Sequence, residues 1–174
     1  MPRVRSGANR SLTLAALWLV TGCAQKVDPE LPRHELRGAP APQFALGSID
    51  DRPVSLRAHR GEVVLVAFFA TWCEPCKKTM PALEALRAKY ASRRLAVLGV
   101  SLDDDPQGLA EYAHAVGVTF PIAWDVGQEA VRPWYVRNLP AEFVVDRTGV
   151  VRAAFIGYAE GVEVEIEREL LRLL

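Results

Sequence analysis

Two continuous apolar runs with an amphipathic segment between them dominate the middle of the chain. Residues 62–69 (EVVLVAFF) and 95–101 (LAVLGVS) are rich in valine, and such unbroken runs are typical of strands buried on both faces of a sheet. Residues 74–91 carry apolar side chains at the spacing of one helical face. These are Met80, Leu83, Leu86 and Tyr90. The pattern therefore predicts a strand, a helix and a second strand.

Shorter elements are predicted on both sides of this unit from turn residues, helix caps and apolar periodicity. They are strands at 43–46 and 53–56 joined by turn residues 47–51, a helix opened by Asp105 and Pro106 that ends near Gly117, a strand at 120–124, a short helix at 128–135, a hairpin of strands 141–146 and 150–156, and a closing amphipathic helix at 162–173. This order of elements predicts an α/β sandwich with helices on both faces of the sheet.

The composition is that of a globular protein, and the length of 174 residues corresponds to one domain. The 21 Lys and Arg residues balance the 21 Asp and Glu residues. Three of the arginines lie in a leader that we expect to be removed, which leaves 18 basic residues and a net charge of −3. A mildly acidic chain without a basic stripe is not a nucleic-acid-binding protein.

The N-terminus has the features of an export signal. Arg3, Arg5 and Arg10 precede a short apolar run at 12–20, which is too short for the roughly 20 residues that span a bilayer. The run is followed by Leu-Val-Thr-Gly-Cys at 19–23, which resembles the bacterial lipobox. That resemblance implies cleavage before Cys23 and lipid attachment at its sulfur. The alternative is an ordinary signal peptide in which Cys23 is incidental.

The expected organisation follows from this leader. Residues 1–22 are the lipoprotein signal peptide, and residues 23–42, with four prolines, are the anchored cysteine and its tether. Residues 43–174 form the folded domain. Acyl chains contribute about 0.8 kcal/mol per buried CH₂, so several chains together hold a domain on a membrane. We therefore expect the domain to be lipid-anchored to a bacterial membrane, in the periplasm or extracytoplasmic space.

The residues that carry chemistry are Trp72-Cys73-Glu74-Pro75-Cys76, between the first predicted strand and its helix. Two cysteines three positions apart on the first turn of a helix can close a disulfide with little backbone movement. The positive end of the helix dipole favours the thiolate of Cys73, which makes it the expected nucleophile. Cys76 would then resolve the mixed disulfide. Glu74 beside Cys73 opposes the dipole, so we expect a reductant rather than a strong oxidant.

Two other roles are possible for a cysteine pair of this spacing. A structural disulfide across so short a loop constrains the unfolded chain little. A zinc half-site needs two further ligands, but His34, His59 and His114 are scattered along the sequence and there is no second cysteine pair. Redox chemistry, with no metal, is the favoured interpretation.

Three stretches of the chain resemble the extracytoplasmic TlpA/ResA branch of the thioredoxin fold. They are Phe44 with DDRPVSL at 50–56 and GEVVLV at 61–66, CEPCKK at 73–78, and Phe120-Pro121 with LPAEFVVD at 139–146 and Gly149. The resemblance implies a thioredoxin-like three-layer sandwich with a mixed central sheet and an N-terminal β-hairpin extension. It also implies that Pro140 is a cis-proline facing the disulfide, with the Leu139 backbone turned to pair with an extended substrate segment.

The same resemblance implies a membrane-tethered thiol–disulfide oxidoreductase, usually a reductant. Its substrates would be exported proteins with disulfides, in cytochrome c maturation among other processes. No cofactor is implied beyond the redox-active Cys73–Cys76 disulfide, and a membrane thiol donor would reduce that disulfide again.

Several positions depart from the pattern of these families. Thioredoxins carry a buried Asp where this chain has Ala67, and some branch members carry a Glu where it has Thr79. Glu142 is the remaining proton-relay candidate, and the alternative is a solvated glutamate at a strand end. Trp72 is expected either to contact a partner or to cover the disulfide. The run at 103–105 (DDD) is interpreted as a helix start rather than a metal site.

Two other classes of function were compared with the reductase. A peroxiredoxin-like peroxidase requires Thr or Ser at the position of Ala70 and Pro at the position of Val66, so that motif fails. A non-enzymatic thioredoxin-fold binding module would keep its activity in cells without either cysteine.

Overall fold

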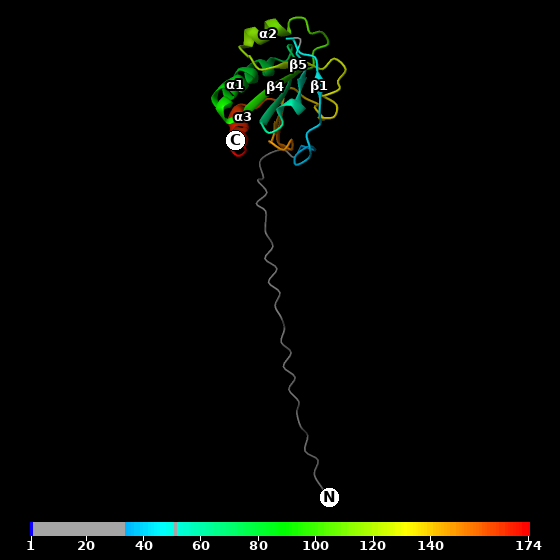
Figure 1. Ribbon diagram of the computed structural model, residues 1–174, viewed down its shortest axis with the longest axis vertical. Coiled ribbons are helices and arrows are strands. Elements are labelled where there is room, and N and C mark those ends of the chain that lie inside the picture. Colours follow the sequence, from blue (N-terminus) through cyan, green and yellow to red (C-terminus); the bar gives the residue numbers. More distant parts are fainter. Residues whose placement is uncertain (2–33, 51) are drawn as a thin grey trace.

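The computed structural model describes Met1 and residues 34–50 and 52–174. Its centre is a five-stranded mixed sheet in the order β5-β4-β3-β6-β7 (Figure 1). The strands are β3 (Val63–Phe69), β4 (Leu95–Ser101), β5 (Ile122–Trp124), β6 (Ala141–Val145) and β7 (Val151–Ile156). β3, β4 and β5 run parallel, and β6 and β7 are antiparallel to their neighbours. The predicted mixed sheet is confirmed, and the central strand β3 is buried along its whole length, as its unbroken apolar run predicts.

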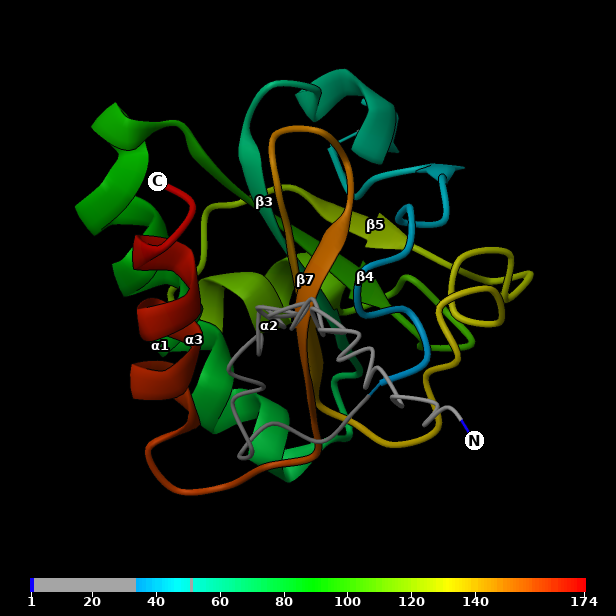
Figure 2. The ribbon, with the colours of Figure 1, turned by 90° about the horizontal axis from the view of Figure 1, so that it is seen from below.

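One face of the sheet is covered by helices (Figure 2). They are α1 (Glu74–Tyr90), α2 (Leu109–Val116) and α3 (Val162–Leu171). Their buried side chains form one apolar core with Val63, Leu65, Ala67 and Phe69, the alternate residues of β3 that point to this face. The core also contains Cys76, so it reaches from the closing helix to the predicted reactive site.

The opposite face is covered by the N-terminal part of the domain and by the turns between β5 and β6. The predicted N-terminal hairpin is present as β1 (Ala45–Leu46) and β2 (Val54–Ser55), followed by the 3₁₀ helix η1 (Leu56–His59). The prediction of a helix at 128–135 is wrong, because this segment forms turns. Gln128 and Tyr135, at the two ends of the expected helix, have positive φ angles of 56° and 53°, and Pro133 within it has no amide hydrogen to donate. The α-helices therefore lie on one face, and these turns take the place of the helix expected on the other.

Trp134 holds the turns against the sheet. Its side chain is fully buried, its ring centroid lies 5.6 Å from that of Phe68 and 4.8 Å from that of Phe143, and its Nε1 donates to the carbonyl of Pro42 at 3.1 Å. A buried indole satisfies its one polar group in this way while its ring contributes a large apolar area to the core.

The segment before the hairpin also packs on the domain. The Gly38 amide donates to the carbonyl of Val151, and the Ala41 amide to that of Gly149, both at 2.8 Å. Leu36 is buried. The folded part therefore begins before the boundary expected at residue 43. The predicted signal peptide, Cys23 and the first part of the tether lie outside the described residues.

Helix α2 starts later than predicted. The Asp105 carboxylate accepts the Gln107 amide at 2.8 Å, which closes a turn before the helix rather than capping it, and the helix begins at Leu109 after Gly108, whose φ is 84°. Gly117 ends it with a φ of 74°, as its position predicts. No helix among the described residues is long and apolar enough to cross a membrane.

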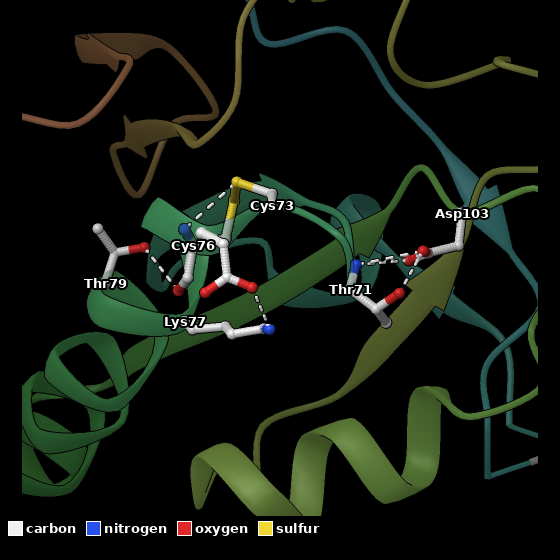
Figure 3. Close-up of a disulfide and its surroundings, with 7 residues drawn as sticks. Thr71, Cys73, Cys76, Lys77, Thr79 and Asp103 are labelled. Atoms are coloured by element: carbon white, nitrogen blue, oxygen red, sulfur yellow. Dashed lines mark hydrogen bonds and ion pairs between the residues drawn. A yellow bond between two sulfur atoms is a disulfide. The ribbon is translucent and has the colours of Figure 1, made fainter.

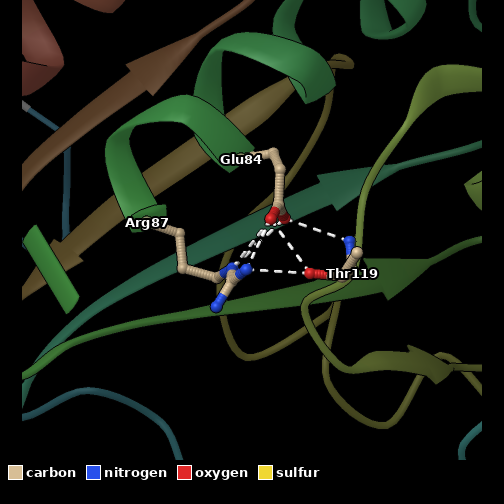
Figure 4. Close-up of polar contacts among 3 residues, drawn as sticks. All are labelled: Glu84, Arg87 and Thr119. Carbon is tan, nitrogen blue, oxygen red and sulfur yellow. Dashed lines mark hydrogen bonds and ion pairs between the residues drawn. The ribbon is translucent and has the colours of Figure 1, made fainter. Parts of the chain in front are cut away.

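Helix α1 is tied to the loop before β5 by polar contacts of Glu84, Arg87 and Thr119 (Figure 4). Glu84 accepts the backbone amide of Thr119 at 3.0 Å and its hydroxyl at 2.9 Å, and Arg87 Nη2 donates to the same hydroxyl at 2.8 Å. The 3₁₀ turn η2 (Ala91–Arg93) then leads from α1 into β4.

Candidate active site

Cys73 and Cys76 form a disulfide where the central strand passes into helix α1 (Figure 3). The S–S distance is 2.03 Å and the Cα atoms are 5.3 Å apart. Cys73 is the N-cap residue of α1, and its Sγ accepts the Cys76 amide at 3.3 Å. Cys73 is 5% exposed and Cys76 is completely buried. Both cysteines are buried, and the first is the more accessible of the two.

The helix makes the Cys73 sulfur a favourable place for negative charge. α1 is 17 residues long, with Pro75 in its first turn, and its dipole points its positive end at the N-cap. The amide that contacts the sulfur in the disulfide is also positioned to stabilise a Cys73 thiolate once the disulfide is reduced.

The side chains around the disulfide are mostly exposed. Trp72 is 69% exposed, so it is not packed into the core. The Glu74 carboxylate is also exposed and pairs with Lys77 Nζ at 2.5 Å. Lys78 Nζ lies 5.4 Å from the ring centroid of Tyr158, in the loop after β7. The ion pair partly neutralises the carboxylate beside Cys73. Glu74 therefore disfavours the Cys73 thiolate less than an unpaired carboxylate would.

The Leu139–Pro140 peptide bond is cis. Pro140 directly precedes β6, and its carbonyl accepts the Gly157 amide at 2.8 Å. The pairing of Ala141 with Phe68 places Pro140 at the end of β3 that leads to Cys73. Leu139 is half-buried and packs against the apolar cores on both sides of the sheet.

Glu142 lies in the interior. Its side chain is on β6, directly opposite Ala67 of β3, and is only 1% exposed. Neither carboxylate oxygen has a hydrogen-bond partner of normal geometry among the described residues. Burial raises the pKa of Glu142 to about 8, and the nearby Thr79 side chain opposes the rise only in part. The alternative of a solvated strand-end glutamate is therefore wrong, because the antiparallel register turns this side chain into the core.

Asp103 is a residue of the site that the sequence did not reveal. It was assigned to a helix start, but its side chain is 7% exposed and holds the loop before Cys73 (Figure 3). Its carboxylate accepts the Thr71 hydroxyl at 2.7 Å, the Thr71 amide at 3.1 and 3.2 Å, and the Ser101 hydroxyl at 2.7 Å. The available signal was its place just after the second parallel strand, since the ends of parallel strands share one edge of a sheet.

The buried hydroxyl of Tyr112 is within electrostatic range of this carboxylate but has no hydrogen-bond partner among the described residues. Tyr112 is on α2, and its ring stacks on Phe69 with centroids 5.5 Å apart. Burial first, and then the negative charges of Asp103 and Glu74, raise the pKa of Tyr112 to about 12. The phenol is therefore neutral at physiological pH. No group of three or more potential metal ligands occurs among the described residues.

This chain is similar in sequence to known oxidoreductases and thioredoxin-like proteins. Residues 37–154 match the AhpC/TSA family. The thiol-disulfide oxidoreductase ResA of Bacillus thuringiensis is 30% identical over 120 residues, 69% of each chain. The thioredoxin-like protein YneN of Bacillus subtilis is 33% identical over 137 residues, 76% of this chain and 79% of YneN.

The same likeness extends to solved structures. A crystal structure from Chlorobium tepidum, of a protein provisionally described as thiol:disulfide interchange protein DsbE, superposes with a TM-score of 0.75 at 29% identity. The match covers 79% of this chain and 96% of that one.

Proposed function

This chain belongs to the AhpC/TSA family and is a thiol–disulfide oxidoreductase of the ResA type, and we propose that it reduces disulfides in exported proteins. The observation that carries the proposal is the Cys73–Cys76 disulfide at the N-terminus of α1, with Cys73 slightly exposed and Cys76 completely buried. A pair arranged in this way can attack with one sulfur and resolve with the other.

The proposed reaction begins with the reduced pair. The Cys73 thiolate attacks one sulfur of a substrate disulfide, and the other substrate sulfur leaves as a thiol. Cys76 then attacks Cys73 Sγ, which releases the second substrate thiol and forms the Cys73–Cys76 disulfide. Two electrons have passed to the substrate. A membrane thiol donor returns two electrons and restores the dithiol.

The direction of transfer follows from how weakly the site stabilises the Cys73 thiolate. Strong oxidants of this class stabilise the reduced form through a low thiolate pKa. Here the intervening residues are Glu74 and Pro75, and neither supplies a positive charge. Lys77 supplies one, but it is paired with Glu74. The helix N-terminus alone then favours the thiolate, as it does in proteins that act as reductants.

Location and substrate are the further parts of the proposal. The leader and the sequence around Cys23 support export, lipidation at that cysteine and anchoring of the domain outside the cytoplasm. Exported proteins with disulfides are the proposed substrates, and the cysteines of apocytochrome c are among them. The resemblance to ResA-type oxidoreductases supports this assignment.

Trapping of the substrate tests the proposal. In cells that express Cys76→Ala, Cys73 has no resolving partner and should remain covalently joined to exported proteins, which mass spectrometry of the purified complexes identifies. Cys73→Ala is the matched control and should trap far less. Equal trapping by both variants would contradict the assignment of Cys73 as nucleophile.

Two assays separate the alternative classes. A peroxidase would consume hydrogen peroxide with a thiol donor, and we expect no consumption above that of the Cys73→Ser/Cys76→Ser variant, because Ala70 and Val66 replace the residues of the peroxidase motif. A binding module would retain full activity in cells that express this double variant, whereas the oxidoreductase loses it.

A further inference from the structure

One step of the proposed cycle places a negative charge on a sulfur in the interior of the protein, where it is unfavourable. When the donor thiolate attacks Cys73 Sγ, the bond to Cys76 breaks and Cys76 leaves with the electron pair. Its sulfur is completely buried, in an apolar core that includes Met80 and Phe155. Burial in such surroundings disfavours a thiolate. An acid in the same core would let the sulfur leave as a neutral thiol, with the negative charge passing to the conjugate base of the acid.

Glu142 is placed to serve as that acid. Residues directly opposite each other in an antiparallel pair point to the same face, and Glu142 is opposite Ala67, which lies in the same core as Cys76. The side chain therefore enters the core beneath α1 from the strand that follows the cis-proline. Its carboxyl group is buried and without a hydrogen-bond partner among the described residues, so it is not committed to holding the fold together.

Thr79 lies close to both residues. It is one turn after Cys76 on α1, and its hydroxyl donates to the Cys76 carbonyl at 3.2 Å (Figure 3). The same side chain is close enough to Glu142 to affect the pKa of that carboxyl. One side chain of α1 therefore lies next to both Cys76 and Glu142.

Other charged groups are remote from Glu142 or already paired. The buried residues of α1 near it are Cys76, Thr79 and Met80, and the residues opposite it on the flanking strands are Ala67 and Phe155. The core residues from α3 are apolar. The buried Glu169 of α3 pairs with Arg172 at 2.7 Å. The other titratable side chains of this core are Cys73, Tyr90 and Tyr112. Cys76 is the one that Thr79 contacts, and Thr79 also acts on Glu142.

We propose that Glu142 stores the proton of Cys76. This inference rests on the proposed oxidoreductase function and adds a proton donor and acceptor to it. In the oxidised protein Glu142 is a neutral acid. When a donor thiolate bonds to Cys73 and breaks the disulfide, Glu142 gives its proton to the departing Cys76 sulfur and becomes a carboxylate. When Cys76 later attacks Cys73 Sγ in a mixed disulfide with substrate, the proton returns to Glu142, and the substrate sulfur leaves and takes a proton from water.

The energetics agree with this exchange. A pKa of about 8 for Glu142 lies just below the ordinary value of about 8.5 for a cysteine thiol, and burial raises the thiol pKa further, so the proton passes from the acid to the departing Cys76 sulfur. Ala67 occupies the place where thioredoxins carry a buried Asp. The register shows that a carboxyl from β6 reaches the same part of the core from the opposite strand.

The two chemical steps can be followed separately with the reduced full chain and the disulfide reagent 5,5′-dithiobis(2-nitrobenzoate). Attack by Cys73 releases one coloured thiolate, and attack by Cys76 on the resulting mixed disulfide releases a second. In Glu142→Gln we expect the first phase to be unchanged and the second to be slowed at least about tenfold at pH 7, within the range of general base catalysis. The pH dependence of the second phase should also lose the contribution of the carboxyl.

Matched variants distinguish proton storage from packing. Glu169→Gln removes the charge of another buried glutamate, on α3, and should leave both phases unchanged. Adding Ala67→Asp to Glu142→Gln returns a carboxyl to the opposite strand and should recover most of the lost rate. If Glu142→Gln does not fold, the Glu142→Asp variant is used in its place. We expect a smaller slowing of its second phase, which should keep the pH dependence of a carboxyl.

If the rate of the second phase in Glu142→Gln is within twofold of the rate in the unchanged protein, the inference is overturned. Equal slowing of both phases would also overturn it. Either result would leave the proposed function intact. Release of a single coloured thiolate by the unchanged protein would instead contradict the proposed function itself, because the Cys73–Cys76 disulfide would not have formed.

Discussion

The Asp103 carboxylate is expected to hold the loop that presents Cys73, and Asp103→Asn tests this directly. The substitution keeps the size of the side chain but removes its charge and turns one acceptor oxygen into a donor. An amide oxygen can still accept both hydrogen bonds from Thr71. The amide nitrogen then faces the Ser101 oxygen, which already accepts the Asp103 backbone amide at 3.1 Å. The Ser101 hydroxyl therefore loses its acceptor.

The magnitude follows from the bonds affected. Hydrogen bonds to charged groups contribute about 1.5–3 kcal/mol, and one such bond is lost outright while the others lose their charge, so we expect a loss of about 2–3 kcal/mol in the free energy of unfolding. For a domain of this size that corresponds to a fall in Tm of roughly 8–12 °C. Because Thr71 lies two residues before Cys73, looser anchoring should also slow substrate reduction, by about tenfold.

Chemical denaturation and thermal melting of the oxidised protein measure the first effect, and the rate of disulfide reduction by folded protein well below the Tm measures the second. Asp104→Asn, at the exposed neighbouring position, is the control and should change neither quantity. Equal stability of the Asp103→Asn and Asp104→Asn variants would refute the proposed anchoring of the loop.

Three other predictions concern separate parts of the chain. Cys23→Ser should leave the protein uncleaved or in the soluble fraction, and normal membrane fractionation of this variant would contradict lipidation. Glu74→Gln should lower the pKa of Cys73 and shift its reduction potential upward by at most about 30 mV, because the exposed carboxylate is already paired with Lys77; a redox titration checks this. Hydrogen bonds in the β6–β7 turn lower the pKa of Asp146 from 3.8 to about 2 despite its burial, so its stabilising contribution is complete above pH 3.8 and lost as the pH falls through 2. Asp146→Asn should therefore destabilise the protein at pH 7 and have little effect at pH 2 in denaturation curves.

The strands and helices with strong periodicity could be predicted from the sequence. The apolar runs gave β3 and β4 their positions to within a residue, and the face of α1 was correct because its apolar spacing is regular. The segment at 128–135 contains Pro133, a local signal against the predicted helix. The positive φ angles of Gln128 and Tyr135 and the burial of Trp134 depend on tertiary packing, which the local pattern does not contain.

The site was predicted only in part for a related reason. The two cysteines are adjacent in sequence, so their spacing identifies them. Glu142 and Asp103 are brought to the site by strand register and by the shared edge of parallel strands. Glu142 was found as a candidate, but whether it was buried or solvated depended on which face of β6 it occupied. Asp103 has two acidic neighbours, and nothing in the run DDD distinguishes the one residue that turns inward.

The reduction potential of the Cys73–Cys76 pair tests the central claim most directly. Equilibration of the protein with graded ratios of reduced and oxidised dithiothreitol, followed by alkylation and mass spectrometry, gives the fraction reduced at each ratio. A reductase should have a potential in the region of thioredoxin, about −270 mV, and below the roughly −180 mV of protein disulfide isomerase. A potential near −120 mV, that of a strong oxidant, would contradict the account.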